Sequence, residues 1–174
     1  EVACTKDAVA KYGINNLTAL GKQSPKLVYS ANAEHLTRAD GLPLLKKAYG
    51  VRFKKVISVT ISLRYRPIED GSAQCVYAFG TDPKLAKLPL ELIQDDKGTF
   101  SGSVPFRTVP LVNTKWLDGL TAEQKAAVEK ALNAVDAGLS QEKIQELNAA
   151  VDLDKEDPED VAAEFVDGLG LGSK

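Results

Sequence analysis

Apolar runs of strand length alternate with helix-like patterns through the first two thirds of the chain. The runs are rich in β-branched and aromatic residues and are bounded by Gly, Pro, Ser or Asp, which is typical of strands. One expected helix has Asp40 as its cap and Pro43 in its first turn. The alternation predicts an α/β layer with a largely parallel sheet. We expect strands at residues 26–30, 53–61, 74–79, 88–94 and 106–113, and helices at 41–49 and 62–69.

The pattern changes near Trp116, and the chain is then helical. Thr121 and Gln124 match a capping box, in which a hydroxyl and an amide satisfy N–H donors at a helix start. Gly138 is expected to end the helix that follows. We therefore divide the chain into an α/β part, residues 1–116, and a helical part, residues 117–174. The expected helices cover residues 125–135, 140–151 and 161–166.

Charge is spread unevenly along a chain that is close to neutral overall. The 174 residues carry 22 Lys and Arg against 24 Asp and Glu, a net charge of −2. Eight basic residues and one acidic residue fall between positions 38 and 66, whereas fourteen acidic and four basic residues fall between 117 and 168. The basic stretch is expected to be a solvated face, and the overall balance argues against a nucleic-acid partner.

Side chains with catalytic chemistry are few and poorly placed for it. The single histidine, His35, has no partner at the spacing of a metal site or a catalytic pair. Asp95 and Asp96 are adjacent, so they are expected to point to opposite sides at a strand end. Cys4 and Cys75 lack the spacing of a zinc site and are either a disulfide pair or two buried thiols. We therefore expect no catalytic residue, no cofactor and no bound metal.

The chain at the end of strand 74–79 has the pattern of a binding site. Phe79 is followed by a turn, a helix cap at Thr81 and Asp82, and a proline. Helix starts at the carboxyl edge of an α/β sheet often meet ligands. The segment that follows the strand at 26–30 leaves the sheet at the same edge and carries Arg38, whose guanidinium is suited to binding a carboxylate. Phe79 offers the face of its ring to a cation. The alternative is that Arg38 pairs with a neighbouring aspartate or solvent and that Phe79 lies in the core.

Six short motifs follow one another in an order that is more specific than any one of them. They are Thr-Lys-Asp-Ala-Val-Ala-Lys-Tyr-Gly at 5–13, Arg-Ala-Asp-Gly-Leu at 38–42, Leu-Arg-Tyr at 63–65, Phe-Gly-Thr-Asp at 79–82, Asp-Asp-Lys-Gly at 95–98 and Asp-Pro-Glu-Asp-Val-Ala at 157–162. In this order the chain resembles the substrate-binding proteins of ABC importers for osmoprotectants (glycine betaine, choline, carnitine). The resemblance implies an α/β fold, a three-layer αβα periplasmic-binding-protein-like (type II) lobe with appended C-terminal helices.

The resemblance also implies which parts of the family fold this chain contains. Proteins of this family have two lobes joined by hinge strands, with the ligand between them. This chain would begin in a hinge strand at residues 1–5, form the second lobe over 1–116 with a return strand near 109–113, and add helices, 117–174, that normally pack on lobe I. About a hundred residues of lobe I would be missing. The start at Glu1 and the absence of methionine fit such a processed or trimmed product.

Individual residues gain roles from the resemblance. Arg38 corresponds to the arginine that grips the ligand carboxylate, and Phe79 to one aromatic wall of the cage around the ammonium group. Thr81 and Asp82 supply the helix start beside the carboxylate. Ser103 stands where relatives often carry a tyrosine, so one wall of the cage is lost unless a nearby phenylalanine replaces it.

The implied partners are a small zwitterionic or quaternary-ammonium solute, an ABC permease, and the missing lobe I or another copy of the chain. The implied location is extracytoplasmic, in the periplasm or on a cell-surface lipoprotein, where a disulfide can persist. The hinge strand would lie beside strand 74–79, and this brings Cys4 near Cys75. The alternative function is a single-lobe module that oligomerises or binds a protein without tight solute binding.

Overall fold

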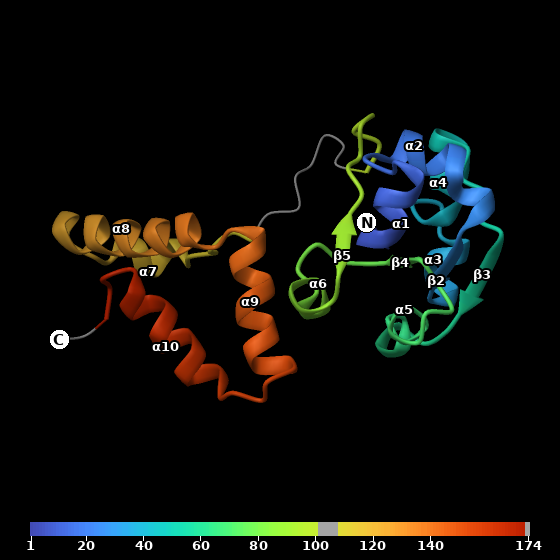
Figure 1. The fold of residues 1–174 in the computed structure, drawn as a ribbon. Helices are drawn as coiled ribbons and strands as arrows, with labels where there is room; N and C mark the ends of the chain where they lie inside the picture. The colour runs from blue at the N-terminus through green and yellow to red at the C-terminus, as the bar shows by residue number, and fades with distance from the viewer. Residues whose placement is uncertain (101–107, 173–174) are drawn as a thin grey trace. The chain divides into compact units, whose positions relative to one another are not determined.

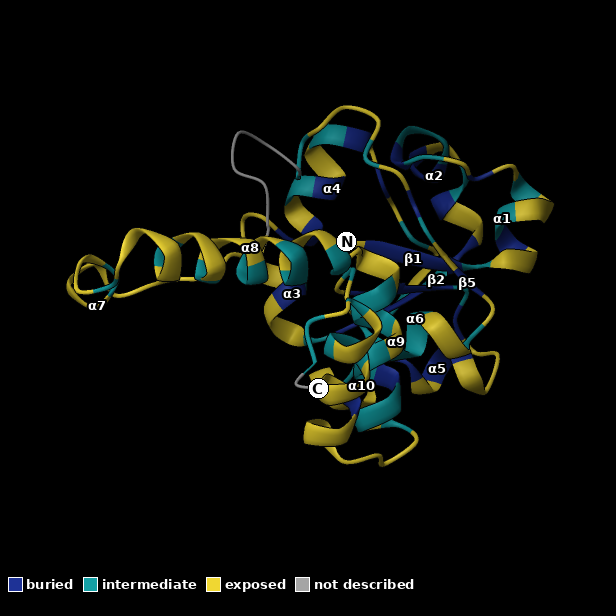
Figure 2. Cartoon of the chain, turned by 90° about the vertical axis from the view of Figure 1, so that its left-hand side faces the viewer, coloured by how far each residue is buried: buried dark blue, intermediate teal, exposed yellow. Residues whose placement is uncertain are grey.

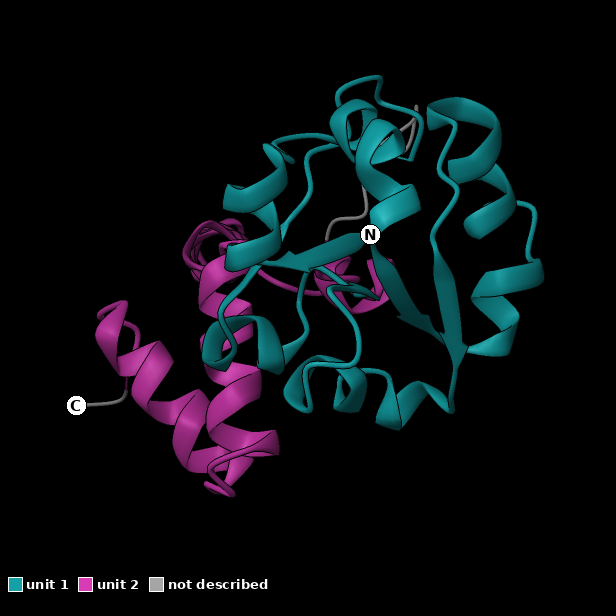
Figure 3. Ribbon diagram, turned by 45° about the vertical axis from the view of Figure 1, so that its right-hand side comes forward, with its two compact units in different colours: residues 1–105 teal, residues 106–174 magenta. Residues whose placement is uncertain are grey.

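The structure, a computed structural model, describes residues 1–100 and 108–172. It divides into two units, residues 1–105 and 106–174, each with its own packing (Figure 3). The division falls before the change of pattern at Trp116, which lies inside a short helix of the second unit. Among the described residues, no helix combines the length and the apolar character that a membrane span requires.

The first unit contains a five-stranded sheet in the order β3-β2-β4-β1-β5 (Figure 1). β2 is parallel to β3 and β4, whereas β1 is antiparallel to β4 and β5. The prediction of a largely parallel sheet is therefore wrong for β1. Alternating strands and helices predict the direction of successive strands only, and both neighbours of β1 come much later in the chain. The strands are β1 Val2–Thr5, β2 Val28–Ala31, β3 Lys55–Ser58, β4 Cys75–Tyr77 and β5 Leu90–Leu92.

Short helices connect the strands, and local side chains fix where they begin. The Thr5 hydroxyl accepts from the N–H of Ala8 at the start of α1, and Asn16 accepts from Ala19 at the start of α2. The predicted helix 62–69 is two separate turns. These elements are α1 Lys6–Tyr12, α2 Leu17–Gln23, η1 Ser24–Lys26, α3 Ala33–Thr37, α4 Leu42–Tyr49, η2 Ile61–Leu63, α5 Arg66–Glu69 and α6 Pro83–Lys87.

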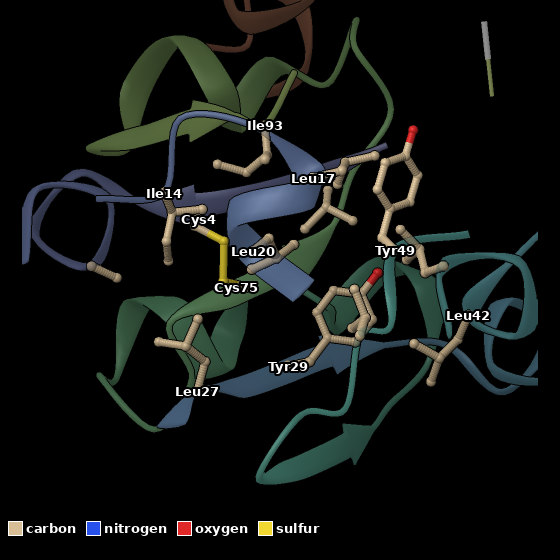
Figure 4. Packing of buried hydrophobic residues seen from close by; sticks show 14 of the residues in the cluster. Cys4, Ile14, Leu17, Leu20, Leu27, Tyr29, Leu42, Tyr49, Cys75 and Ile93 are labelled. Atoms are coloured by element: carbon tan, nitrogen blue, oxygen red, sulfur yellow. A yellow bond between two sulfur atoms is a disulfide. The ribbon is translucent and has the colours of Figure 1, made fainter. Parts of the chain in front are cut away.

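The two faces of the sheet bury different side chains, because successive residues of a strand point to opposite faces. Cys4, Tyr29 and Cys75 lie in a cluster with residues of α1, α2 and α4 (Figure 4). Ala3 and Val76 lie in a second cluster with residues of α5 and α6. Helices on both faces give the predicted three-layer αβα arrangement, and Figure 2 shows buried strands beneath helices with exposed outer sides.

Cys4 and Cys75 are joined by a disulfide between β1 and β4 (Figure 4). The two residues are direct partners in the antiparallel register, and both are fully buried. This is the pair that the family resemblance implied, and β1 lies beside the strand that the resemblance assigned to it. The sheet and the covalent bond together fix the first strand between β4 and β5.

The second unit is helical over most of its described length. Thr121 and Gln124 form both hydrogen bonds of the predicted capping box. Residues 108–113 are not in a strand, so that part of the predicted strand 106–113 is wrong, while 106 and 107 lie outside the described residues. A strand needs a neighbour for its N–H and C=O groups, and here Val109 and Leu111 are exposed instead. The helices are α7 Thr114–Asp118, α8 Ala122–Gly138, α9 Gln141–Asp152 and α10 Pro158–Gly168.

Candidate functional site

Three parallel strands end side by side at one edge of the sheet, and each leads into one part of the candidate site. Since β2 pairs in parallel with both β3 and β4, the three carboxyl ends lie at the same edge. β2 leads into α3 and Arg38, β3 leads into Arg64, and β4 leads into Phe79. Segments that are distant in the sequence therefore meet where α/β sheets usually bind ligands.

A line of rings runs from the core of the first unit to this edge. Phe53 stacks on Tyr29 with the ring centres 4.4 Å apart, and Tyr29 lies 5.9 Å from His35. His35 stacks on Tyr77 at 3.9 Å, and Tyr77 meets Phe79 edge-on at 5.2 Å. We call these five residues the aromatic row. Its outer end, Phe79, is 48% exposed, so the alternative that Phe79 lies in the core is wrong.

Arg38 pairs with the neighbouring Asp40, so this half of the alternative is confirmed, and it is held by a second carboxylate of its own segment, Glu34. Its Nε and Nη2 donate to the two oxygens of Asp40 at 2.8 and 2.6 Å, and its Nη1 donates to Glu34 at 3.1 Å. The bond from Arg38 lowers the pKa of the Asp40 carboxyl. Asp40 was expected to cap α4, but Gly41 occupies the cap position and Asp40 turns to the guanidinium instead. The Arg38 side chain remains 52% exposed.

The segments that carry Arg38 and Phe79 both reach Tyr77. The ring of Phe79 contacts that of Tyr77, and His35, on α3 just before Arg38, stacks on the same ring. The chain beyond Arg38 turns back tightly against α3, because a Cβ on Gly41 would lie 2.1 Å from the carbonyl oxygen of His35. The structure thus brings these two predicted residues to the same end of the unit.

The other predicted residues have different surroundings. Asp82 stands at the cap position of α6, but its side chain makes no cap hydrogen bond there and binds Arg64 instead. Thr81 is exposed in the turn before α6. Ser103 lies outside the described residues. Phe100, which was a candidate to replace the lost cage wall, packs partly buried against the core cluster of the first unit.

Arg64 is the residue of this edge that the sequence reasoning missed. It is only 8% exposed, although the basic stretch that contains it was expected to be a solvated face. Its guanidinium carbon lies 5.3 Å from the centre of the Phe79 ring. The motif Leu-Arg-Tyr at 63–65, which already carried part of the family resemblance, was an available indication that Arg64 has a role.

His35 is a buried, structural histidine. Its Nε2 lies 3.0 Å from the Tyr29 hydroxyl, and its ring is stacked on Tyr77. Burial, followed by nearby positive charge, lowers its pKa from 6.5 to about 4. His35 is therefore neutral at neutral pH, and the aromatic row carries no charge of its own under those conditions.

This lowered pKa predicts an acid-dependent loss of stability. His35 takes up a proton near pH 6.5 in the unfolded chain but only near pH 4 in the folded chain. The free energy of unfolding is therefore highest above pH 6.5 and falls as the pH drops towards 4. The expected loss across this window is roughly 2–3 kcal/mol. Urea unfolding at several pH values would measure it, and His35→Gln should remove this part of the slope. An unchanged slope in that variant would contradict the prediction.

The adjacent carboxylates Asp95 and Asp96 form hydrogen bonds with different parts of the chain. Asp95 accepts from the Tyr49 hydroxyl and from the N–H of Phe100, whereas Asp96 accepts from the N–H and hydroxyl of Thr18. They therefore do not form a catalytic pair. Within residues 1–100 and 108–172, no group of three His, Cys, Asp or Glu side chains is arranged to hold a metal ion.

Comparison of the sequence with known proteins identifies its family. Residues 1–168 match the OpuAC family, the substrate-binding domain of ABC-type glycine betaine transport systems. The chain is 29% identical to EgtU of Helicobacter pylori, an ergothioneine transport permease/ergothioneine binding protein. The alignment of 170 residues covers 98% of this chain and 29% of EgtU. The chain is 25% identical over 162 residues to the carnitine transport binding protein OpuCC of Listeria monocytogenes, covering 92% and 50%.

Solved structures agree with the fold. A glycine betaine/carnitine/choline ABC transporter structure superposes with a TM-score of 0.80 at 25% identity, covering 98% of this chain and 60% of the other. Apo YehZ from Escherichia coli superposes with a TM-score of 0.74 at 23% identity, covering 98% and 61%. The chain therefore spans less than two thirds of the length of each of these relatives.

Proposed function

Because the chain belongs to the OpuAC family of substrate-binding domains, we propose that it captures a small solute for an ABC importer. The matched relatives are transport binding proteins and not enzymes. The proposed solute is a compatible solute such as glycine betaine, choline or carnitine. One observation carries the proposal: the strands that lead to Arg38 and to the exposed ring of Phe79 are parallel neighbours and end at the same carboxyl edge of the sheet, where His35 and Phe79 both contact Tyr77.

In the proposed complex the two ends of the solute are recognised separately. Three of the five N–H groups of Arg38 bind Asp40 and Glu34, which hold the guanidinium in place, and the others serve the solute carboxylate. Thr81 lies in the turn beside this site. The exposed face of Phe79 receives the ammonium group through a cation–π contact. Ser103 contributes a hydroxyl and no ring.

The matched relatives are longer than this chain, so we propose that a second lobe completes the ligand site. A second lobe, supplied by the rest of a longer protein or by another copy, would close over the solute, since small-ligand sites usually bury about 70–90% of their ligand. Residues 117–174 would pack on that lobe. We further propose an ABC permease as the receiving partner and an extracytoplasmic location, which suits the Cys4–Cys75 disulfide.

Calorimetry with glycine betaine and carnitine tests the proposal on the full-length product of the gene that encodes this chain. Arg38→Ala should weaken binding by about tenfold or more, because charge-assisted hydrogen bonds are lost. Phe79→Ala should weaken it by roughly three- to thirtyfold, because the cation–π contact is lost. A single copy of the 174-residue chain should bind weakly or not at all.

Arg52→Ala is the matched control. Arg52 is also exposed, but it precedes β3 and so lies towards the amino edge of the sheet. It should leave the affinity unchanged. Equal losses for Arg38→Ala and Arg52→Ala would show that the effect is general charge and not recognition. Tight binding by the 174-residue chain as a monomer would contradict the need for a second lobe.

Exposed apolar side chains in the second unit favour the alternative, a module that associates with itself or another protein. Leu111 is 94% exposed, Val109 61% and Trp116 52%. Where such side chains gather into one patch, that patch usually marks a surface that another chain or lobe covers. Light scattering distinguishes the alternatives, because association should raise the mass above that of one chain. A monomer that binds solute as a full-length product would exclude the self-associating module.

A further inference from the structure

A buried ion pair lies directly beside the ring that we propose as the cation wall. Arg64 Nη2 donates to both oxygens of Asp82, at 2.6 and 2.5 Å. The two side chains are only 10% and 12% exposed. The guanidinium carbon lies 4.9 Å from the centre of the Tyr65 ring and 5.3 Å from that of Phe79, so the positive charge is within cation–π distance of both rings.

Each partner of the pair also binds the surrounding chain. Arg64 Nε donates to the carbonyl of Tyr77 at 3.1 Å, and Arg64 Nη1 donates to the carbonyl of Ile61 at 2.6 Å. Asp82 accepts from the Tyr65 hydroxyl at 2.6 Å and from the N–H of Phe79 at 2.8 Å. The pair therefore ties the segments after β3 and β4 together, and it holds the backbone from which the Phe79 ring projects.

The charge of Arg64 has a consequence for any ligand on that ring. An ammonium group on the exposed face of Phe79 would stand about 10 Å from the guanidinium, counting the ring and one contact distance. At the effective dielectric constant typical of protein surfaces, an uncompensated charge at that distance weakens cation binding by roughly tenfold. The Asp82 carboxylate cancels this repulsion. A zwitterion is affected less, because its carboxylate offsets its ammonium group.

We propose that the Arg64–Asp82 pair determines charge specificity in this site. Asp82 is then a positioning residue that neutralises Arg64 and holds Phe79, and it makes no contact with the solute. The pair allows the ring to accept a cation while its hydrogen bonds keep the ring in place. The inference rests on the proposed function, since it concerns the same ligand site.

The test compares a cation with a zwitterion, namely choline and glycine betaine, in calorimetry on the full-length gene product. Asp82→Asn removes the negative charge and keeps a side chain of similar shape. It should weaken choline binding several-fold to tenfold more than glycine betaine binding, because Arg64 is then uncompensated. The ratio of the two dissociation constants is the decisive measurement, since a purely structural role weakens both ligands alike.

A double variant, Arg64→Met with Asp82→Asn, keeps the test decisive if the single variant is poorly folded. It carries neither charge, so the ratio should return to that of the unchanged protein even if both affinities are lower. If Asp82→Asn weakened the binding of choline and of glycine betaine equally, the inference would be overturned and the proposed function would stand. If the unchanged protein binds neither solute, the proposed function fails, and the inference fails with it.

Discussion

Replacing Tyr29 with alanine is expected to lower the free energy of unfolding by about 4 kcal/mol. Tyr29 is fully buried, and its ring is stacked on Phe53. Removing a large buried aromatic side chain costs about 3–5 kcal/mol through lost burial and the cavity that remains. The change also leaves Nε2 of His35 without its hydroxyl partner. Urea unfolding monitored by circular dichroism measures the effect.

Two variants separate the parts of this effect. Tyr29→Phe keeps the ring and removes only the bond to His35, so it should cost about 1–2 kcal/mol. Phe79→Ala alters the exposed end of the same aromatic row and should cost less than about 1 kcal/mol. If Phe79→Ala destabilised the fold as much as Tyr29→Ala, the row would be a single core element, and its outer end would not be available to a ligand.

Features set by neighbouring residues were predictable from the sequence. The capping box of Thr121 and Gln124 depends on two side chains three positions apart, and the structure forms both of its hydrogen bonds. The apolar run at 74–79 contains β4, because a strand buried on both faces reads as continuous hydrophobic sequence. Such local patterns predicted the α/β layer, whereas the three-layer arrangement was implied by the family resemblance.

Features set by distant residues were not predictable in this way. Arg64 reads as one of eight basic residues in a solvated stretch, yet a carboxylate eighteen positions later draws it into the interior. Asp82 reads as a helix cap, and only the tertiary contact shows that its oxygens bind Arg64 and Tyr65. Residues 108–113 have the composition of a strand, but a strand also needs a neighbour, which composition does not reveal.

The aromatic row was hidden from the sequence for a related reason. Tyr77 and Phe79 are two positions apart, so strand geometry alone places them on one face. His35 comes from α3, however, and its stacking on Tyr77 depends on the parallel pairing of β2 with β4. The sequence showed no catalytic or metal-site partner for His35, but it could not show that this histidine links the core to the candidate site.

Loss of the Cys4–Cys75 disulfide is expected to remove about 4 kcal/mol of stability. The bond closes a loop with a sequence separation of 71 residues, so breaking it returns considerable freedom to the unfolded chain. It also frees β1, which lies between β4 and β5 and carries hydrogen bonds to both. Urea unfolding with and without a reducing agent measures the difference, under conditions in which the agent reaches the buried sulfur atoms.

The double variant Cys4→Ala with Cys75→Ala is the matched control for the reducing agent. It should unfold at the lower urea concentration whether or not the agent is present, whereas the unchanged protein should shift only when it is reduced. Because β1 and the three strands that lead to the site share one sheet, reduction should also loosen the edge that carries Arg38 and Phe79. Equal unfolding midpoints for the oxidised and reduced protein would show that the hydrogen bonds of β1 alone hold the sheet together.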